Sequence, residues 1–575
     1  MLTTSCSTTH ILTDTLCPLS PWQRGGVRVF LALRKGEAEM VQVPGEPVVS
    51  DLSRRAFLAT TGSTLAGAVA CGLVSQATAG TSQPQRGGTL RFATRGDAAG
   101  LDPHRNTIYL VSTLLAATTQ GLIDLDRQSQ PVPGVAMAWD VTPDLLTYTF
   151  RLRQGVLFHN GREVDAAAVH WNFARMQDAK IAHPFTRSTL SNLQAVEVMD
   201  KYTVRCRLHT PSAAFLADVA YYPCNLIAPE SVAQTNTHPI GCGPFKLVRW
   251  ERNSVTELVR FENYFETDAA GNSLPYLDGI IGRPKKEDQV RLTSLRAGEV
   301  DLIDNMAYTD ASNFPKKYVG QFQTWEIPTL GTAFLLFNLE KGPFQDKQLR
   351  LAAAHAIDHE AIKQAAFYGR GETAQGFYAP ASPWHMPGLR AWPAYDPDKA
   401  RAILRQAKAD GTTVILQASL SFPYLQHIAD LVHAMWSEVG FKAMIHLYED
   451  TVLLKKRRDR DFHVDVTSSG YRWDPDGWFS RQLLSSAPAN KLTGSGFNHA
   501  RVDQLIAQAR QTADTQQRLE LYTAIESLVN EELPLLYLHH LTALQAGAIR
   551  LQGYQPAISG PFSIRGGGIR AAWLA

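Results

Sequence analysis

Apolar and polar residues in the last third of the chain predict strands and helices in regular succession. A strand at Val414 to Ala418 leads into a helix whose apolar side chains recur at helical spacing as far as Val439. Gly440 ends that helix, because glycine readily takes the left-handed conformation after a last helical turn. A strand at Lys442 to Tyr448, a short helix and a strand at Phe462 to Val466 follow. This order predicts a mostly parallel sheet.

The earlier part of the chain mixes strands and helices in an α+β pattern. Strands are expected at Gly87 to Ala93 and Tyr148 to Leu152, and a helix is expected from about Ile108 to Thr119. Asp165 is a typical helix N-cap, with an amphipathic helix after it. Near the end of the chain, Pro534 ends a helix, and Leu535 to Leu538 are expected to form a strand after it.

The loop from Gly470 to Trp478 is the first candidate for chemistry, since it leaves the carboxyl end of a predicted strand. Ligands of parallel sheets bind at such ends. Within nine residues the loop carries three aromatic rings, one arginine and two carboxylates. Rings stack on a polar small molecule and a guanidinium binds carboxylate in a directional way, so a binding site is one reading. The other is an ordinary exposed turn, bent by Pro475 and Gly477.

Composition narrows the class of protein. The chain has 575 residues, a net charge of +2, 45% hydrophobic residues and 11 Trp. That length is too great for one core and predicts about three domains beyond the N-terminal region. The balanced charge argues against nucleic acid as a partner.

The N-terminal region reads as an export signal. Arg54 and Arg55 form a twin-arginine pattern, followed by a weakly apolar run of small residues that ends in Ala77-Thr78-Ala79. We expect cleavage near Ala79, which makes residues 1–79 an N-terminal extension with a signal peptide, and a periplasmic location. Alternatives are a membrane anchor and lipid attachment at Cys71, and the true start of translation is Met1 or Met40.

Only three cysteines follow the expected cleavage point, Cys206, Cys224 and Cys242. Two of them could pair in an oxidising compartment, whereas an odd number leaves at least one thiol free. Their spacing matches no metal site, and the sequence leaves the pairing open.

Many short segments, in order, resemble the extracytoplasmic solute-binding proteins of family 5, which serve peptide, nickel and opine transporters. The resemblance spans nearly all of residues 86 to 575. Its motifs are Gly87-Gly88-Thr89-Leu90, Leu101-Asp102-Pro103, Phe158-His159-Asn160-Gly161, Gly241-Cys242-Gly243-Pro244-Phe245, Leu274-Pro275-Tyr276-Leu277-Asp278, Phe337-Asn338, Ala356-Ile357-Asp358, Asp474-Pro475-Asp476 and Leu533-Pro534.

The resemblance implies an α/β chain with the type II periplasmic-binding-protein fold: two lobes joined by a hinge, with an extra α+β domain on the first lobe. Projected onto this sequence, the first lobe combines residues 86–122, 236–328 and 536–575, and the extra domain is 123–235. The second lobe is 329–535, with hinge crossings near Thr329 and Pro534. Such a protein is a monomer that closes around one small molecule and delivers it to ABC permease subunits in the membrane, without a cofactor.

Two other functions compete with binding. Asp474 and Asp476 could act as an acid/base pair of an exported hydrolase, but the resemblance gives this Asp-Pro-Asp a role in shaping the backbone. A metal-chelate binder of the nickel type is the other alternative. His355 and His359 are four residues apart and His539 and His540 are adjacent, but Asp358 is expected to start a new helix between the first two.

The resemblance also points to ligand-binding residues. Peptide-binding relatives often carry an aspartate for the ligand's α-amine where this chain has Tyr471, which argues against ordinary peptides. We expect Arg472 to hold a ligand carboxylate, with Tyr471 and Trp473 lining the pocket; the alternative is a structural salt bridge from Arg472 to Asp474 or Asp476. Further candidates are Trp384, Tyr368 and Arg370.

Overall fold

The computed structural model describes residues 83–106, 117–470, 472–556 and 568–575. The predicted signal region, the start sites, Cys71 and Tyr471 lie outside these residues, and so does most of the helix expected from Ile108. The chain divides into Met1–Gly80 and Thr81–Ala575, and only the second unit is described below.

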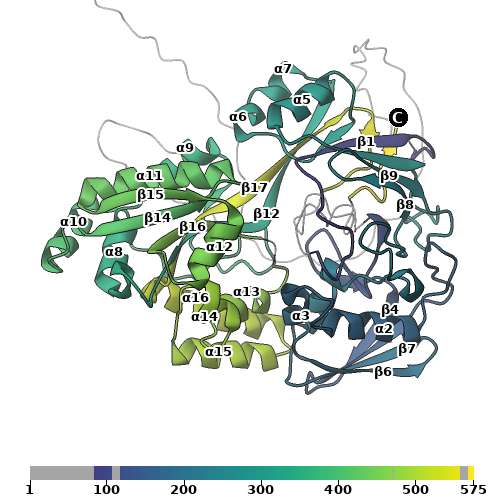
Figure 1. Cartoon of the computed structure of the whole chain (residues 1–575), viewed down its shortest axis with the longest axis horizontal. Helices are drawn as coiled ribbons and strands as arrows, with labels where there is room; N and C mark the ends of the chain where they lie inside the picture. The colour runs from purple at the N-terminus through teal and green to yellow at the C-terminus, as the bar shows by residue number, and fades with distance from the viewer. Residues whose placement is uncertain (1–82, 107–116, 471, 557–567) are drawn as a thin grey trace, which may run out of the picture. The chain divides into compact units, whose positions relative to one another are not determined.

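An eleven-stranded mixed sheet organises this unit (Figure 1). One part of it is the predicted parallel arrangement, because β14 pairs parallel with both β15 and β16. The strands, in spatial order, are β15 (Lys442–Tyr448), β14 (Thr413–Ser419), β16 (Val464–Ser469), β12 (Phe322–Phe337), β17 (Leu535–Ala548), β11 (Leu302–Ile303), β1 (Thr89–Thr94), β10 (Gly279–Pro284), β9 (Val255–Arg260) and β8 (Phe245–Glu251), with β13 (Glu372–Thr373) against β17.

Strands β12 and β17 are the long central pair of the sheet. They run antiparallel from Phe322 opposite Ala548 to Leu336 opposite Leu535, and the register is interrupted between Pro328 and Thr332. On the far side of this interruption β12 also pairs with β16, so the two strands join both halves of the sheet (Figure 1).

Helices cover both halves. Helix α11 (Pro423–Val439) follows β14 and ends at Gly440, whose φ of 117° is the left-handed conformation that the sequence predicts. The other helices in this part of the chain are α8 (Lys347–His355), α9 (His359–Phe367), α10 (Pro397–Gln406), α12 (Asp450–Arg458), α13 (Asp476–Gln482), α14 (Pro488–Thr493), α15 (Ala500–Gln511) and α16 (Thr515–Glu532), with the 3₁₀ turn η3 (Pro343–Gln345). Helices α5 (Asp288–Arg296), α6 (Tyr308–Ala311) and α7 (Phe314–Lys317) come earlier in the chain, between β10 and β12.

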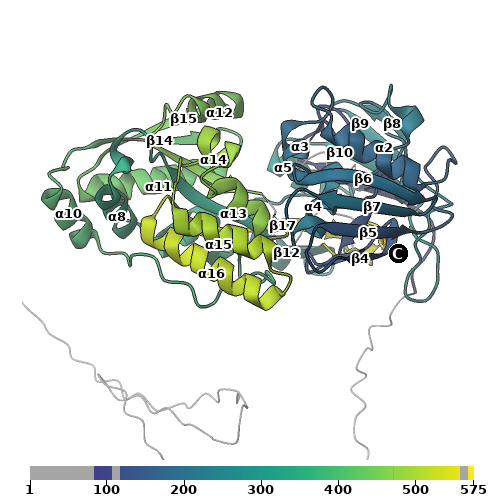
Figure 2. The same ribbon diagram turned by 90° about the horizontal axis from the view of Figure 1, so that it is seen from below.

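A separate four-stranded antiparallel sheet lies in the first third of the chain (Figure 2). Asp165 caps its main helix, α2 (Ala166–Gln177), by accepting a 2.8 Å hydrogen bond from the Ala168 amide, as predicted. The sheet runs β4 (Ala136–Val141), β5 (Thr147–Leu152), β7 (Thr203–Leu208) and β6 (Leu193–Asp200). Smaller elements are α3 (Pro184–Thr189), α4 (Phe215–Val219), η1 (Tyr222–Cys224), η2 (Pro229–Ser231) and the pairs β2 (Ile123–Leu125) with β3 (Pro131–Pro133) and β18 (Leu551–Gln552) with β19 (Trp573–Leu574).

The buried apolar residues fall into separate clusters that follow these sheets. One cluster draws all its buried members from residues 333–538, and another draws all of its own from 122–242. A third combines residues near β1, β8 and β10 with Leu551, Tyr554, Ile569 and Ala572.

Two further expectations can be compared with the structure. Cys206, Cys224 and Cys242 are all buried, and within the described residues none of them forms a disulfide. In the part of the chain that the structure describes, no helix has both the length and the apolar character needed to cross a membrane.

Candidate functional site

Two ion pairs hold the loop that follows β16 in place. Asp474 pairs with Arg518 at 2.6 Å and accepts the Asp476 amide at 2.9 Å. Asp476 pairs with Arg510 at 2.8 Å and also accepts the Ser480 hydroxyl. Both carboxylates are buried and satisfied by these bonds. They fix the start of α13, which is the backbone-shaping role that the resemblance implies.

Arg472 and Trp473 extend from this loop toward the region of α3. The Arg472 guanidinium lies 5.4 Å from the centre of the Phe185 ring, and the Trp473 ring packs edge-on against Tyr221 at 4.5 Å. Phe185 and Tyr221 also contact each other, at 5.4 Å. The contacts join residues more than 250 positions apart in sequence, and Figure 1 draws α3 beside α13.

A second arginine reaches the same ring. Arg481, in the last turn of α13, places its guanidinium 4.8 Å from the centre of the Phe185 ring. Burial and the neighbouring Arg472 lower the pKa of Arg481 to about 10, because both disfavour a positive charge there. The sequence gives no sign of this residue's role, since the face of a seven-residue helix cannot be assigned from its pattern.

Further contacts connect the same two regions of the chain. The Ala213 amide donates a 3.0 Å hydrogen bond to the Arg510 carbonyl. Burial, followed by the charges of Asp476 and Asp474, raises the pKa of Asp218 well above its usual value. Charged groups of the loop and of α13, α15 and α16 therefore lie near Asp218 in α4.

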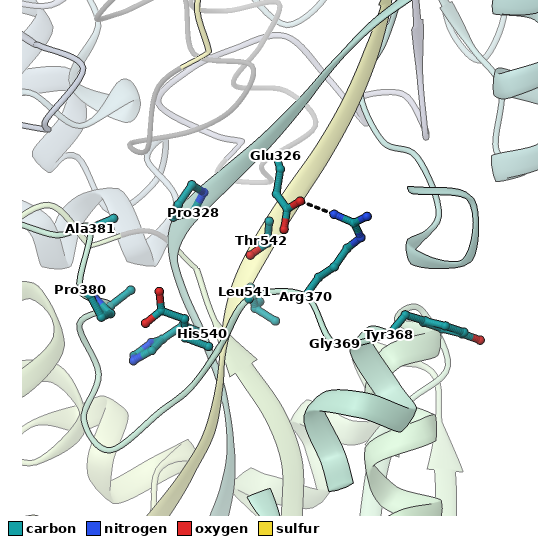
Figure 3. A pocket seen from close by; sticks show the side chains of 13 residues that line it. Glu326, Pro328, Tyr368, Gly369, Arg370, Pro380, Ala381, His540, Leu541 and Thr542 are labelled. Carbon is teal, nitrogen blue, oxygen red and sulfur yellow. Dashed lines mark hydrogen bonds and ion pairs between the residues drawn. The ribbon is translucent and has the colours of Figure 1, made fainter. Parts of the chain in front are cut away.

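A cavity of about 500 Å³ lies beside the interruption in β12 (Figure 3). Across it, Arg370 forms an ion pair with Glu326, and its other terminal nitrogen donates to Ser312 Oγ at 3.2 Å. The lining comes from β12, the turn before β13, residues 379–381 and β17; it consists of Glu326, Pro328, Tyr368, Gly369, Arg370, Gly371, Glu372, Ala379, Pro380, Ala381, His540, Leu541 and Thr542.

The structure thus separates the predicted site residues into three places. Tyr368 and Arg370 line the cavity beside β12, although the Tyr368 side chain points away from Arg370 and is 48% exposed (Figure 3). Trp384 is only 7% exposed and packs 4.9 Å from the Arg518 guanidinium and edge-on to Tyr522. Arg472 and Trp473 lie at α3, and Tyr471 falls outside the described residues.

The histidines considered for metal binding make different contacts. His355 Nδ1 bonds the Ala394 carbonyl at 2.7 Å, whereas His359 opens α9 after its N-cap Asp358, as the sequence predicts. His539 stacks on Phe367 at 3.8 Å, and His540 Nδ1 contacts Thr332 Oγ1 at 3.1 Å. Within the described ranges no group of three or more His, Cys, Asp or Glu side chains is arranged to hold a metal ion.

A mixed sheet whose two halves are joined by two central strands, with aromatic and guanidinium groups meeting from distant segments, is the architecture of a two-lobed α/β protein. The sequence profile of the bacterial extracellular solute-binding proteins, family 5, matches residues 130–491, and the chain belongs to this family. It is therefore an extracytoplasmic solute-binding protein, the type of component that binds a small molecule and works with an ABC permease.

Individual relatives match along most of their length. The dipeptide-binding protein of Escherichia coli K12 is 26% identical over 505 residues, covering 81% of this chain and 92% of that protein. The glutathione-binding protein GsiB of Salmonella paratyphi A is 27% identical over 466 residues, covering 79% and 89%. The structure of AgaA from A. tumefaciens R10 in complex with agropinic acid superposes with a TM-score of 0.72 at 26% identity, covering 85% of this chain and 99% of that one.

Proposed function

We propose that this protein captures a peptide or modified amino acid that carries an acidic group, and that Arg472 binds that group between the two lobes. The observation that carries the proposal is the meeting of Arg472 and Trp473 with Phe185 and Tyr221. A guanidinium beside aromatic rings suits a ligand with a carboxylate and an apolar or planar body.

The relatives support this ligand class through their own ligands. One is named for dipeptides, one for glutathione, and one is solved with agropinic acid. Tyr471 stands where peptide-binding relatives often have an aspartate for the α-amine. A phenol cannot serve as a counter-ion to an ammonium group, so we place the ligand nearer to the modified amino acids than to ordinary peptides.

The proposed lobes retain the boundaries of 86–122, 236–328 and 536–575 for the first and 329–535 for the second, with 123–235 as the extra domain. The interrupted register between Pro328 and Thr332 supports the first hinge crossing. The same interruption lies opposite Leu541, which favours a second crossing somewhat later than Pro534. In this arrangement Tyr368 and Arg370 belong to the hinge side of the site, and Trp384 supports the loop through Arg518.

We further propose that the protein does not catalyse a reaction, since Asp474 and Asp476 are both committed to ion pairs with arginines. It acts as a monomer, and nucleic acid is not one of its partners. Arg54 and Arg55 direct its export by the twin-arginine route to the periplasm, with lipid attachment at Cys71 as the alternative.

Thermal-shift screening against blocked peptides, glutathione, opines, sugars and metal chelates tests the ligand class. A ligand at about 100 times its Kd adds roughly 2.7 kcal/mol to the free energy of unfolding.

We then expect Arg472→Ala to weaken binding of the acidic ligand at least tenfold by calorimetry. Arg401→Ala, which removes a surface ion-pair partner on α10, is the control and leaves the affinity unchanged. Unchanged affinity in Arg472→Ala would remove the assignment.

A further inference from the structure

Two guanidinium groups share one aromatic ring at the proposed ligand site. Arg472 and Arg481 lie 5.4 Å and 4.8 Å from the centre of the Phe185 ring. The positive charge of Arg472 disfavours the charge of Arg481, and the ring's electron-rich face offsets only about 0.5–2 kcal/mol per cation. A bound negative charge would relieve this repulsion.

Among the described residues, Arg481 has no carboxylate close enough to compensate its positive charge. Its Nε is buried without a hydrogen-bond partner among the described residues, and no described carboxylate lies within ion-pair distance of it. The neighbouring carboxylates are used elsewhere, since Asp476 pairs with Arg510 and Asp474 with Arg518. A buried guanidinium nitrogen without a hydrogen-bond partner is costly, and an anion that accepts from it removes that cost.

A second polar group near Arg472 is also unsatisfied. Tyr378 is 3% exposed, and its hydroxyl has no hydrogen-bond partner within the described part of the chain. Burial raises the pKa of this phenol well above its usual value, while the positive charge of Arg472 opposes the shift. The phenol is thus a neutral donor, which suits an anionic oxygen.

We propose that Arg481 and Arg472 together bind an end group with two negative charges, either two adjacent carboxylates or one phosphate monoester. This inference rests on the proposed function and specifies the ligand class. Arg472 comes from the loop and Arg481 from the last turn of α13, so a single end group bridges both. Phe185 covers the pair from α3, which lets the same anion draw the two regions of the chain together.

Calorimetric titration with matched probes tests the inference. The probes are N-acetyl-alanyl-glutamate against N-acetyl-alanyl-glutamine amide, and N-acetyl-alanyl-phosphoserine amide against N-acetyl-alanyl-serine amide, so that only the first member of each pair carries negative charge. We expect the wild-type protein to prefer one of the charged probes by about tenfold or more over its neutral partner. Whichever pair shows the preference distinguishes dicarboxylate from phosphate.

Arg481→Gln is expected to abolish that preference while binding of the neutral probe stays within about twofold. Arg401→Gln serves as the matched control and keeps the preference. Equal binding of charged and neutral probes to the wild-type protein, or an unchanged preference in Arg481→Gln, overturns this inference and leaves the proposed function standing. Binding of none of the four probes, nor of glutathione or opines, overturns both.

Discussion

Glu526 is a fully buried carboxyl group inside the core formed by residues 333–538. One of its oxygens accepts the Phe377 amide at 2.9 Å and the Tyr537 hydroxyl at 3.2 Å, whereas Oε2 has no partner among the described residues. Burial raises the pKa of Glu526 to about 8, because a charged carboxylate is poorly solvated there. The side chain is therefore protonated in the folded protein at neutral pH.

This raised pKa predicts a specific pH dependence of stability. Between the usual carboxyl pKa of about 4.5 and the folded value of about 8, the folded state binds one proton more than the unfolded state. The free energy of unfolding should therefore fall as pH rises through this range, by on the order of 2–4 kcal/mol from this group. Urea unfolding at pH 5 and pH 8 measures the difference.

Glu526→Gln keeps the shape of the side chain and removes the titration. We expect this variant to lose much of the fall in stability between pH 5 and pH 8, whereas the exposed Glu531→Gln should retain it. Equal pH dependence in wild type and Glu526→Gln would contradict the assignment.

At the scale of elements, the turn between α9 and β13 is held against β17 at close range. Tyr368, Gly369 and Gly371 all have positive φ, of 55°, 75° and 73°. A Cβ on Gly371 would lie 2.6 Å from His539 Nε2 and 2.7 Å from the His540 carbonyl oxygen. Only glycine fits both the conformation and the space at this position.

Gly371→Ala should therefore push the turn away from β17 and destabilise the protein. We expect a loss of roughly 2 kcal/mol, from the strained φ and the contact with the strand backbone together. Gly388→Ala is the matched control, since no atom lies within 4 Å of its added Cβ and its φ is not in the left-handed region. Thermal unfolding followed by circular dichroism compares the two, and equal midpoints would contradict the prediction.

The elements also show what the sequence could predict. Helices α2 and α11 were predicted from their apolar spacing and caps, because both bury one face and begin or end at a residue with a strong preference. Strand β17 was predicted only for Leu535 to Leu538, whereas it extends to Ala548. The added residues carry little strand pattern of their own, and their conformation is set by pairing with β12.

The same reasoning applies to the candidate site. Arg472 and Trp473 could be singled out because their loop follows a recognisable strand. Phe185 and Tyr221 could not, since the contact between α3 and the loop depends on long-range packing that no local pattern records.

At the scale of the whole molecule, the separate cores predict unfolding in more than one step. The cluster of residues 333–538 shares no buried member with the cluster of 122–242. Separate cores within one chain need not melt together. Scanning calorimetry of the ligand-free protein should give a calorimetric enthalpy larger than the van't Hoff enthalpy. Equal enthalpies from one reversible transition would show instead that the cores unfold as a unit.

The position of β17 in the sequence sets the order in which the strands of the large sheet can pair. This strand follows in sequence every strand with which it pairs, namely β11, β12 and β13. During synthesis on the ribosome, β11 and β12 are therefore made before their partner. Each keeps one unpaired edge until residues 535–548 have been synthesised. The junction between the two halves of the sheet is completed last, and the growing chain depends on protection of those edges until then.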